Sequence, residues 1–212
     1  MMKIVCISDT HSQHHVMEIP FGDILIHAGD VSKRGSKEEV LDFLHWFSQQ
    51  PHRYKICIAG NHDWFFEKHA NQIQTYIPDN IIYLNDTGIE IEGLNIWGSP
   101  IQPTFYNWAF NRDRGESIKR HWDMIPQNID VLITHGPPFG MLDQIDNGDH
   151  VGCKALLNKV NTVQPLYHIF GHIHEGYGIN NAKNTTFINA SLLTEKYVYK
   201  NKPIEINLLK KS

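Results

Sequence analysis

The stretch Lys3-Ile4-Val5-Cys6-Ile7-Ser8 is apolar almost throughout, and Asp9, Thr10 and His11 follow it directly. A short continuous apolar run of this kind is typical of a β-strand that is covered on both faces. The strand therefore delivers an acidic residue and a histidine at its carboxyl end. In α/β domains ligand sites gather at such strand ends, so the same arrangement elsewhere in the chain would indicate a site.

Further apolar runs predict strands, and helical patterns alternate with them. The predicted strands are 23–28, 54–59, 131–134, 168–170, 186–190 and 204–208, with a hairpin over 89–97 that turns at Glu92-Gly93. Ser36 and Glu39 form a capping box at the start of a predicted helix that Pro51 ends, and 64–77, 117–124 and 153–163 are the other predicted helices. This alternation predicts an α/β layered domain, and no repeat or linker divides 1–212, so we expect a single domain.

Composition excludes several classes of protein. The chain has 212 residues, of which 41% are hydrophobic and 20% charged, which is an ordinary globular balance. Its net charge of −4 argues against a general nucleic-acid coat protein, so no stable nucleic-acid partner is expected. We expect no membrane span and no signal peptide, because no apolar run approaches about 20 residues and the start turns polar at Ser8-Asp9. Three cysteines suit a reducing cytoplasm.

Five predicted strands end in clusters of Asp, Asn or His. These clusters are Asp9-Thr10-His11, Gly29-Asp30, Gly60-Asn61-His62-Asp63, His135-Gly136-Pro137-Pro138 and Gly171-His172-Ile173-His174. Each one alone is compatible with a hydrogen-bonded turn, but desolvating all five at one edge would be costly without a partner. Carboxylate, amide and imidazole ligands suit Mn²⁺, Fe, Zn²⁺, Co²⁺ or Ni²⁺ rather than a soft thiolate site.

Taken together, the five clusters resemble the motifs of the calcineurin-like metallophosphoesterase superfamily. Within this superfamily, the chain most resembles the metallophosphoesterase-domain-containing brain proteins and their microbial relatives. The stretches that carry this resemblance are residues 134–138, Val151-Gly152-Cys153 and residues 171–178. The resemblance implies a four-layer α-β-β-α sandwich of two mixed sheets flanked by helices. It also implies a dinuclear site in which one ion is held by Asp9, His11 and His174, the other by Asn61, His135 and His172, and Asp30 bridges both.

The implied activity is hydrolysis of a phosphoric ester, most simply a small phosphodiester such as a cyclic nucleotide, with Mn²⁺ as the expected metal. A hydroxide that bridges the two ions would attack phosphorus in line. Two divalent ions would outweigh the charge of Asp9, Asp30 and the hydroxide, so the site would attract an anion although the chain is acidic. The alternatives are a serine/threonine-type protein phosphatase, a phosphomonoesterase, and a non-catalytic interaction module that the metals stabilise.

Two residues beside the ligands are predicted to act in catalysis. His62 is expected to be the general acid, or a hydrogen-bond donor to the phosphoryl oxygen, and Asp63 either orients His62 or caps the turn. Candidate substrate contacts are His150, Arg112, Arg114 and Trp108. The arginines would bind phosphate unless they are solvated, and Trp108 with its aromatic neighbours either stacks on a base or anchors the 101–116 loop.

Overall fold

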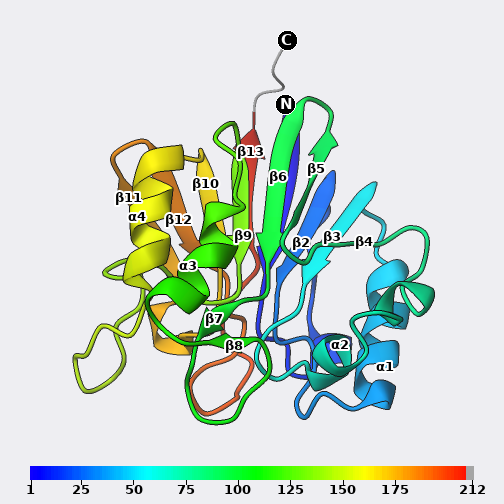
Figure 1. Cartoon of the computed structure of the whole chain (residues 1–212). Helices are drawn as coiled ribbons and strands as arrows, with labels where there is room; N and C mark the ends of the chain where they lie inside the picture. Colours follow the sequence, from blue (N-terminus) through cyan, green and yellow to red (C-terminus); the bar gives the residue numbers. More distant parts are fainter. Residues whose placement is uncertain (209–212) are drawn as a thin grey trace.

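Two mixed β-sheets pack face to face in the computed structural model, which describes residues 1–208 (Figure 1). The first sheet has the order β13-β1-β2-β3-β4. Its strands are β1 (Met2–Ile7), β2 (Ile24–Ala28), β3 (Tyr54–Ile58), β4 (Ile82–Tyr83) and β13 (Ile204–Leu208). Strands β1 to β4 are parallel and only β13 runs against them, so the carboxyl ends of β1, β2 and β3 share one edge.

The second sheet has the order β11-β12-β10-β9-β6-β5. Its strands are β5 (Thr87–Ile91), β6 (Leu94–Ser99), β9 (Val131–Thr134), β10 (Tyr167–Phe170), β11 (Gly178–Ala182) and β12 (Thr185–Asn189). The four inner strands are parallel and the two edge strands are antiparallel. A short separate pair, β7 (Gln102–Pro103) and β8 (Asn111–Arg112), lies in the loop that follows β6.

Helices cover the outer face of each sheet, which confirms the expected α-β-β-α layering. In Figure 1, α1 (Lys37–Ser48) and α2 (Trp64–Lys68) lie beside the first sheet, and α3 (Glu116–Asp123) and α4 (Lys154–Val163) beside the second. Three short 3₁₀ helices, at His14–Val16, Ile73–Thr75 and His174–Gly176, complete the elements. In the described part of the chain, no helix combines the length and apolarity needed to cross a bilayer.

Side chains alternate between two apolar layers along each inner strand. On β1, Ile4 and Cys6 join the cluster between the sheets, whereas Val5 and Ile7 join the cluster beneath the helices. Both faces of the strand are therefore dry, which is why its sequence is apolar without a period of two.

Most predicted elements are confirmed within one or two residues at each end. Strands 131–134 and 204–208 match, and the capping box is formed, since Ser36 Oγ accepts from Glu39 N and the Glu39 carboxylate accepts from Ser36 N. The predicted helix 64–77 is wrong. It ends at Lys68, because residues 69–72 present no apolar side chain to the core before Ile73.

The capping box predicts a measurable contribution to stability. Ser36→Ala removes the acceptor of the Glu39 amide, and we expect it to lower the free energy of unfolding by about 1 kcal/mol. Urea denaturation measures this. Ser48→Ala, at the other end of α1, is the control and should change stability by less than about 0.5 kcal/mol. Equal effects of the two substitutions would contradict the capping role.

Candidate metal centre

The ends of five strands meet at one edge of the sandwich and bring all seven predicted ligands together. The predicted ligands directly follow β1 (Asp9 and His11), β2 (Asp30), β3 (Asn61), β9 (His135) and β10 (His172 and His174). Within each sheet these strands are parallel, so their carboxyl ends point the same way. An isolated bridge between Ser8 and Ser191 and a hydrogen bond from Gly171 N to His135 O hold the loops of this edge together.

The backbone of the site is held in a conformation that L-residues rarely adopt. Asp9, His11, Asp30 and His172 have positive φ angles of 53°, 41°, 56° and 68°. Each such residue costs on the order of 1–3 kcal/mol, so the packed sheets must stabilise the arrangement. The same crowding explains Gly60, where a Cβ would collide with the Asp30 carboxylate and the His135 ring.

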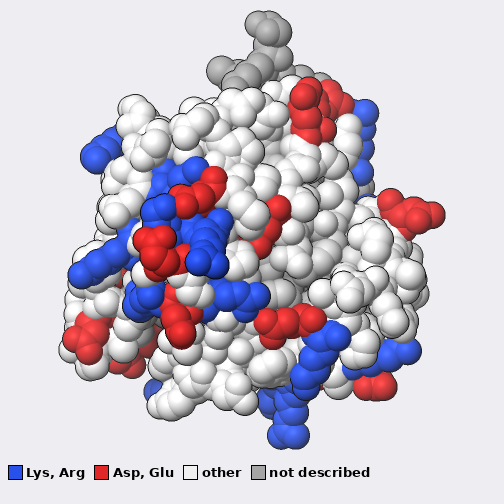
Figure 2. All heavy atoms as spheres, viewed as in Figure 1, with Lys and Arg blue, Asp and Glu red and all other residues white. Residues whose placement is uncertain are grey.

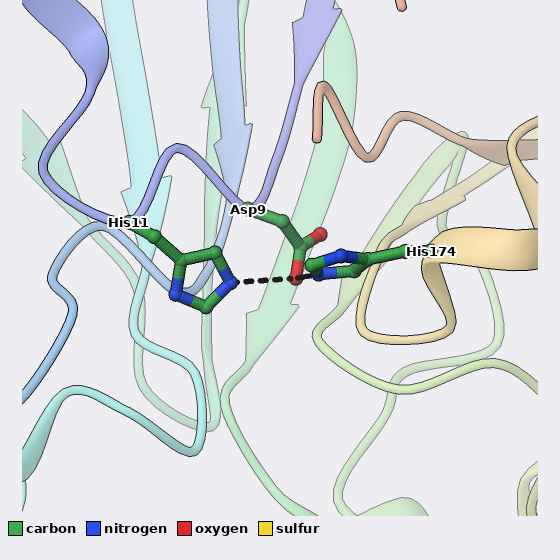
Figure 3. Close-up of side chains that lie close together, drawn as sticks. All are labelled: Asp9, His11 and His174. Atoms are coloured by element: carbon green, nitrogen blue, oxygen red, sulfur yellow. Dashed lines mark hydrogen bonds and ion pairs between the residues drawn. The ribbon is translucent and has the colours of Figure 1, made fainter. Parts of the chain in front are cut away.

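Asp9, His11 and His174 form the first group of converging side chains (Figure 3). The Asp9 Oδ1 atom lies 3.3 Å from His174 Nε2 and 3.9 Å from His11 Nε2. The other carboxylate oxygen, Oδ2, accepts hydrogen bonds from Ser191 Oγ at 2.8 Å and from His172 N at 3.0 Å. Asp9 is thus fixed by donors on one side and faces two imidazole nitrogens on the other.

Asp30, Asn61, His135 and His172 form the second group. The Asn61 Oδ1 atom lies 2.8 Å from both His135 Nε2 and His172 Nδ1. The Asp30 carboxylate lies between the two groups, with Oδ1 at 3.3 Å from His135 Nε2 and Oδ2 at 3.6 Å from His11 Nε2. This is the position that a bridging ligand would need.

Three of the histidines are oriented as metal-binding imidazoles usually are, with one ring nitrogen on a carbonyl. His11 Nδ1 pairs with Ser32 O, His135 Nδ1 with Ala28 O and His174 Nδ1 with Thr194 O, at 3.2, 3.0 and 2.8 Å. Each ring therefore directs Nε2 into the site. In the described residues 1–208, the buried Nε2 of His11 has no hydrogen-bond partner, so the donor set fits a bound cation.

The pKa shifts of the buried side chains also fit a bound cation. Burial alone would raise the pKa of Asp9, but its hydrogen bond with His174 and the charge of that ring lower it. Burial would lower the pKa of His135 and His174, yet the carboxylates of Asp30 and Asp9 raise both to about 9. Burial lowers the pKa of His172 to about 3 and of His11 to about 4. The buried carboxylates favour positive charge in the site. Burial keeps His172 and His11 neutral, which is the form in which an imidazole binds a metal ion.

His62 lies beside this centre, outside the two groups of predicted ligands. Its Nδ1 pairs with the carbonyl of Lys33 at 2.7 Å, and its Nε2 lies 3.9 Å from Asp30 Oδ2. Trp108 stacks on the imidazole, with ring centroids 4.3 Å apart and an angle of 27° between the planes. A carbonyl and an indole therefore fix the ring, and Nε2 is the atom that faces the centre.

Asp63 does not orient His62, so that part of the prediction is wrong. Its buried carboxylate accepts hydrogen bonds from the amides of Val31, Ser32 and Gly60 at 3.2, 2.9 and 2.8 Å, and from the Ser32 hydroxyl. Burial and the charge of Asp30 raise the pKa of Asp63 to about 6. Asp63 joins the loops after β2 and β3, which is the turn-capping role that was its alternative.

A cavity of about 320 Å³ opens over the centre. His62, Trp108 and Arg114 line it, but two of the predicted substrate contacts do not. Arg112 is directed to the Asn111 carbonyl and the His121 ring, at 2.7 and 3.2 Å. His150 pairs with Asp143 and lines a neighbouring cavity instead. Arg114 donates to the carbonyls of Val151 and Gly152 and thereby ties this loop to the rim.

One lining residue, Tyr197, carries no signal in the sequence. It lies in the loop between β12 and β13, far from every motif, and its ring centroid is 4.8 Å from that of His11 and 5.5 Å from that of His174.

Charge on the surface is mixed. On the face shown in Figure 2, Lys and Arg side chains gather over α3 and α4 and alternate with Asp and Glu, as in the pair of Lys119 and Asp123.

Comparison with known proteins agrees with the class that this fold and centre define, a metal-dependent phosphoesterase. The family model described as calcineurin-like phosphoesterase matches residues 2–176, and the chain belongs to this family. The family depends on a dinuclear metal centre.

Two curated relatives and one solved structure extend the likeness. The human metallophosphoesterase domain-containing protein 1 is 44% identical over 97% of this chain and 71% of its own length. The Caenorhabditis elegans UPF0046 protein K07C11.7 is 40% identical over 100% of this chain and 77% of its own. Among solved structures, TT1561 of Thermus thermophilus shares the fold at 12% identity, with a TM-score of 0.60 over 89% of this chain and 88% of its own.

The hydrogen bonds of Asp63 predict that it acts on stability. Asp63→Ala leaves three buried amides without an acceptor, and each such group costs about 1–3 kcal/mol. We expect the free energy of unfolding to fall by at least about 3 kcal/mol in urea denaturation. Asp63→Asn retains one acceptor oxygen and should lose less. Two variants as stable as the wild type would contradict this role.

Proposed function

We propose that residues 1–212 form one catalytic domain that hydrolyses small phosphodiesters with two divalent metal ions. Asp9, His11 and His174 would hold one ion, Asn61, His135 and His172 the other, and Asp30 both. The observation that carries the proposal is the position of the Asp30 carboxylate, 3.3 Å from His135 Nε2 and 3.6 Å from His11 Nε2. When bound, such ions neutralise phosphate charge, orient the ester for in-line attack and acidify water into a nucleophile near neutral pH.

His62 would serve as the proton donor to the leaving oxygen. Its Nδ1 is engaged with the Lys33 carbonyl, so the exchangeable proton is carried at Nε2 on the side of the centre. Imidazole exchanges protons near neutral pH, which suits this task. Trp108 would hold the ring in place by stacking on it.

The size of the cavity favours a small substrate. Its volume of about 320 Å³ is at the lower end of the roughly 300–1,000 Å³ that is usual for small-molecule sites. Cyclic nucleotides, the substrate class that the family resemblance suggests, are of suitable size. We propose Mn²⁺ as the metal; Fe, Zn²⁺, Co²⁺ and Ni²⁺ also suit the mixed carboxylate, amide and imidazole ligand set. Three free, buried cysteines support a reducing compartment such as the cytoplasm.

Hydrolysis of paired chromogenic esters tests the proposal. Metal-stripped protein is assayed with bis(p-nitrophenyl) phosphate and p-nitrophenyl phosphate before and after addition of Mn²⁺. We expect metal-dependent turnover with preference for the diester, and almost none from Asp30→Ala because both ions lose a ligand. Preference for the monoester would favour a phosphomonoesterase. A folded protein that is inactive with every divalent metal would favour an interaction module.

The role of His62 predicts a dependence on the leaving group. His62→Ala should lower kcat by about 100-fold or more for an alkyl phosphodiester, whose leaving oxygen needs a proton, and less for a nitrophenyl diester. Metal content, measured by mass spectrometry, should stay at the wild-type level. His45→Ala, in α1, is the control. Loss of metal from His62→Ala would make His62 a ligand and refute the acid role.

A further inference from the structure

Hydrogen bonds of the backbone fix the position of Tyr197 at the edge of the metal centre. Its backbone is in the left-handed region, with φ of 59°, although no glycine is present there. The turn is fixed on both sides, because Tyr197 N donates to Thr194 O at 2.8 Å and Thr194 N donates to Val198 O at 2.9 Å. Gln13 Nε2 donates to the Tyr197 carbonyl at 3.0 Å and ties this turn to the loop that follows β1.

The same turn orients a candidate ligand. The carbonyl of Thr194, which accepts from Tyr197 N, also accepts from His174 Nδ1 at 2.8 Å. One peptide group therefore sets both the direction of the His174 ring and the position of Tyr197. A backbone conformation that is unfavourable for a tyrosine is retained at a point where it is coupled to the centre.

The Tyr197 ring contacts the imidazoles of the centre by its edge or face. Its centroid is 4.8 Å from that of His11, 5.5 Å from that of His174 and 6.2 Å from that of His62, with interplanar angles of 73°, 71° and 59°. The residue is 43% exposed and lines the cavity described above. The ring is thus packed on the side of the centre and open on the side of the cavity.

The hydroxyl is the part of Tyr197 that bears on substrate binding. Thr104 Oγ1 already donates to Asp113 Oδ1 at 2.8 Å, and Arg114 already donates to two carbonyls. By contrast, within residues 1–208 the structure assigns no hydrogen bond to the Tyr197 hydroxyl. A phenol is neutral at pH 7 and offers one O–H donor. Phosphoryl oxygens accept hydrogen bonds, so the ligand chemistry of the cavity matches this donor.

We propose that the Tyr197 hydroxyl donates a hydrogen bond to a phosphoryl oxygen of the substrate in this cavity. The inference rests on the proposed phosphodiesterase function and adds a substrate contact to it. Charge on that oxygen grows during attack on phosphorus, so the contact strengthens in the transition state. Loss of the hydroxyl therefore affects turnover at least as much as binding.

The decisive comparison is Tyr197→Phe against wild type, both loaded with Mn²⁺. The substitution keeps the ring and removes only the donor. A hydrogen bond to a charged acceptor is worth enough for about a tenfold change, so we expect the dissociation constant of inorganic phosphate, measured by calorimetry, to rise about tenfold. The kcat/KM for bis(p-nitrophenyl) phosphate should fall by about tenfold or more. Metal content should equal that of the wild type.

Tyr199→Phe is the matched control, because it makes the same change two residues further along the same loop, where the side chain packs against the core. It should behave as wild type. Tyr197→Ala separates ring from hydroxyl. If only the ring matters, Tyr197→Phe stays within twofold of wild type while Tyr197→Ala loses phosphate binding, and the proposal is overturned. Loss of metal from Tyr197→Phe would also overturn it, since the hydroxyl would then support the centre rather than the substrate.

The two proposals fail in different ways. A wild-type protein that hydrolyses neither ester contradicts the phosphodiesterase function, while the calorimetric comparison of phosphate binding still decides the role of Tyr197. An active wild type with an equally active Tyr197→Phe refutes the role of Tyr197 and leaves the function standing.

Discussion

Two carboxylates, Asp9 and Asp30, are buried at the ends of the neighbouring strands β1 and β2, with 0% and 2% of their surface exposed. Removing such charges from water is strongly unfavourable unless donors or cations replace the lost hydration. Ser191 and the amides of His172 and His62 supply part of the replacement. The carboxylates also favour positive charge nearby. They raise the pKa of His135 and His174, so both rings gain a proton more readily. Divalent cations bound by both carboxylates would supply the rest of the replacement.

The strain of the site follows from this constraint. Asp9 and Asp30 must turn inward directly after a strand, and both do so with positive φ. Gly171 allows the approach, because a Cβ there would collide with the Asp9 carboxylate and Ser8. The two apolar layers of the sandwich, together with the hydrogen bonds of Asp63, stabilise a loop geometry that would relax in isolation. The rigidity of the fold is therefore what positions the candidate ligands.

The sequence predicted those features that are local or that repeat. Apolar strands such as 131–134 and the capping box of Ser36 and Glu39 carry their own signal, and the polar strand ends revealed the centre. The short strands β7 and β8 were not predicted, because two residues show no period. Edge strand β11 was missed because its sequence, Gly-Ile-Asn-Asn-Ala, has no apolar run and none of its residues is buried. The direction of a side chain could not be predicted either. Asp63 has suitable chemistry, but it turns to amides of the loop after β2, which only the tertiary structure brings near. Arg112 also has suitable chemistry, but it turns to the carbonyl of its neighbour Asn111 and to the His121 ring. Tyr197 shows the opposite: it belongs to no motif, yet its loop places it at the site.

The proposed function requires that this edge of the sandwich holds two divalent ions and that Asp30 binds both. The most direct measurement is the number of metal ions per chain, determined by mass spectrometry after chelation, reloading with Mn²⁺ and removal of the excess. We expect two ions per chain for the wild type and one or fewer for a folded Asp30→Ala variant. A wild-type chain that retains no ion, or an Asp30→Ala variant that retains two, would contradict this expectation.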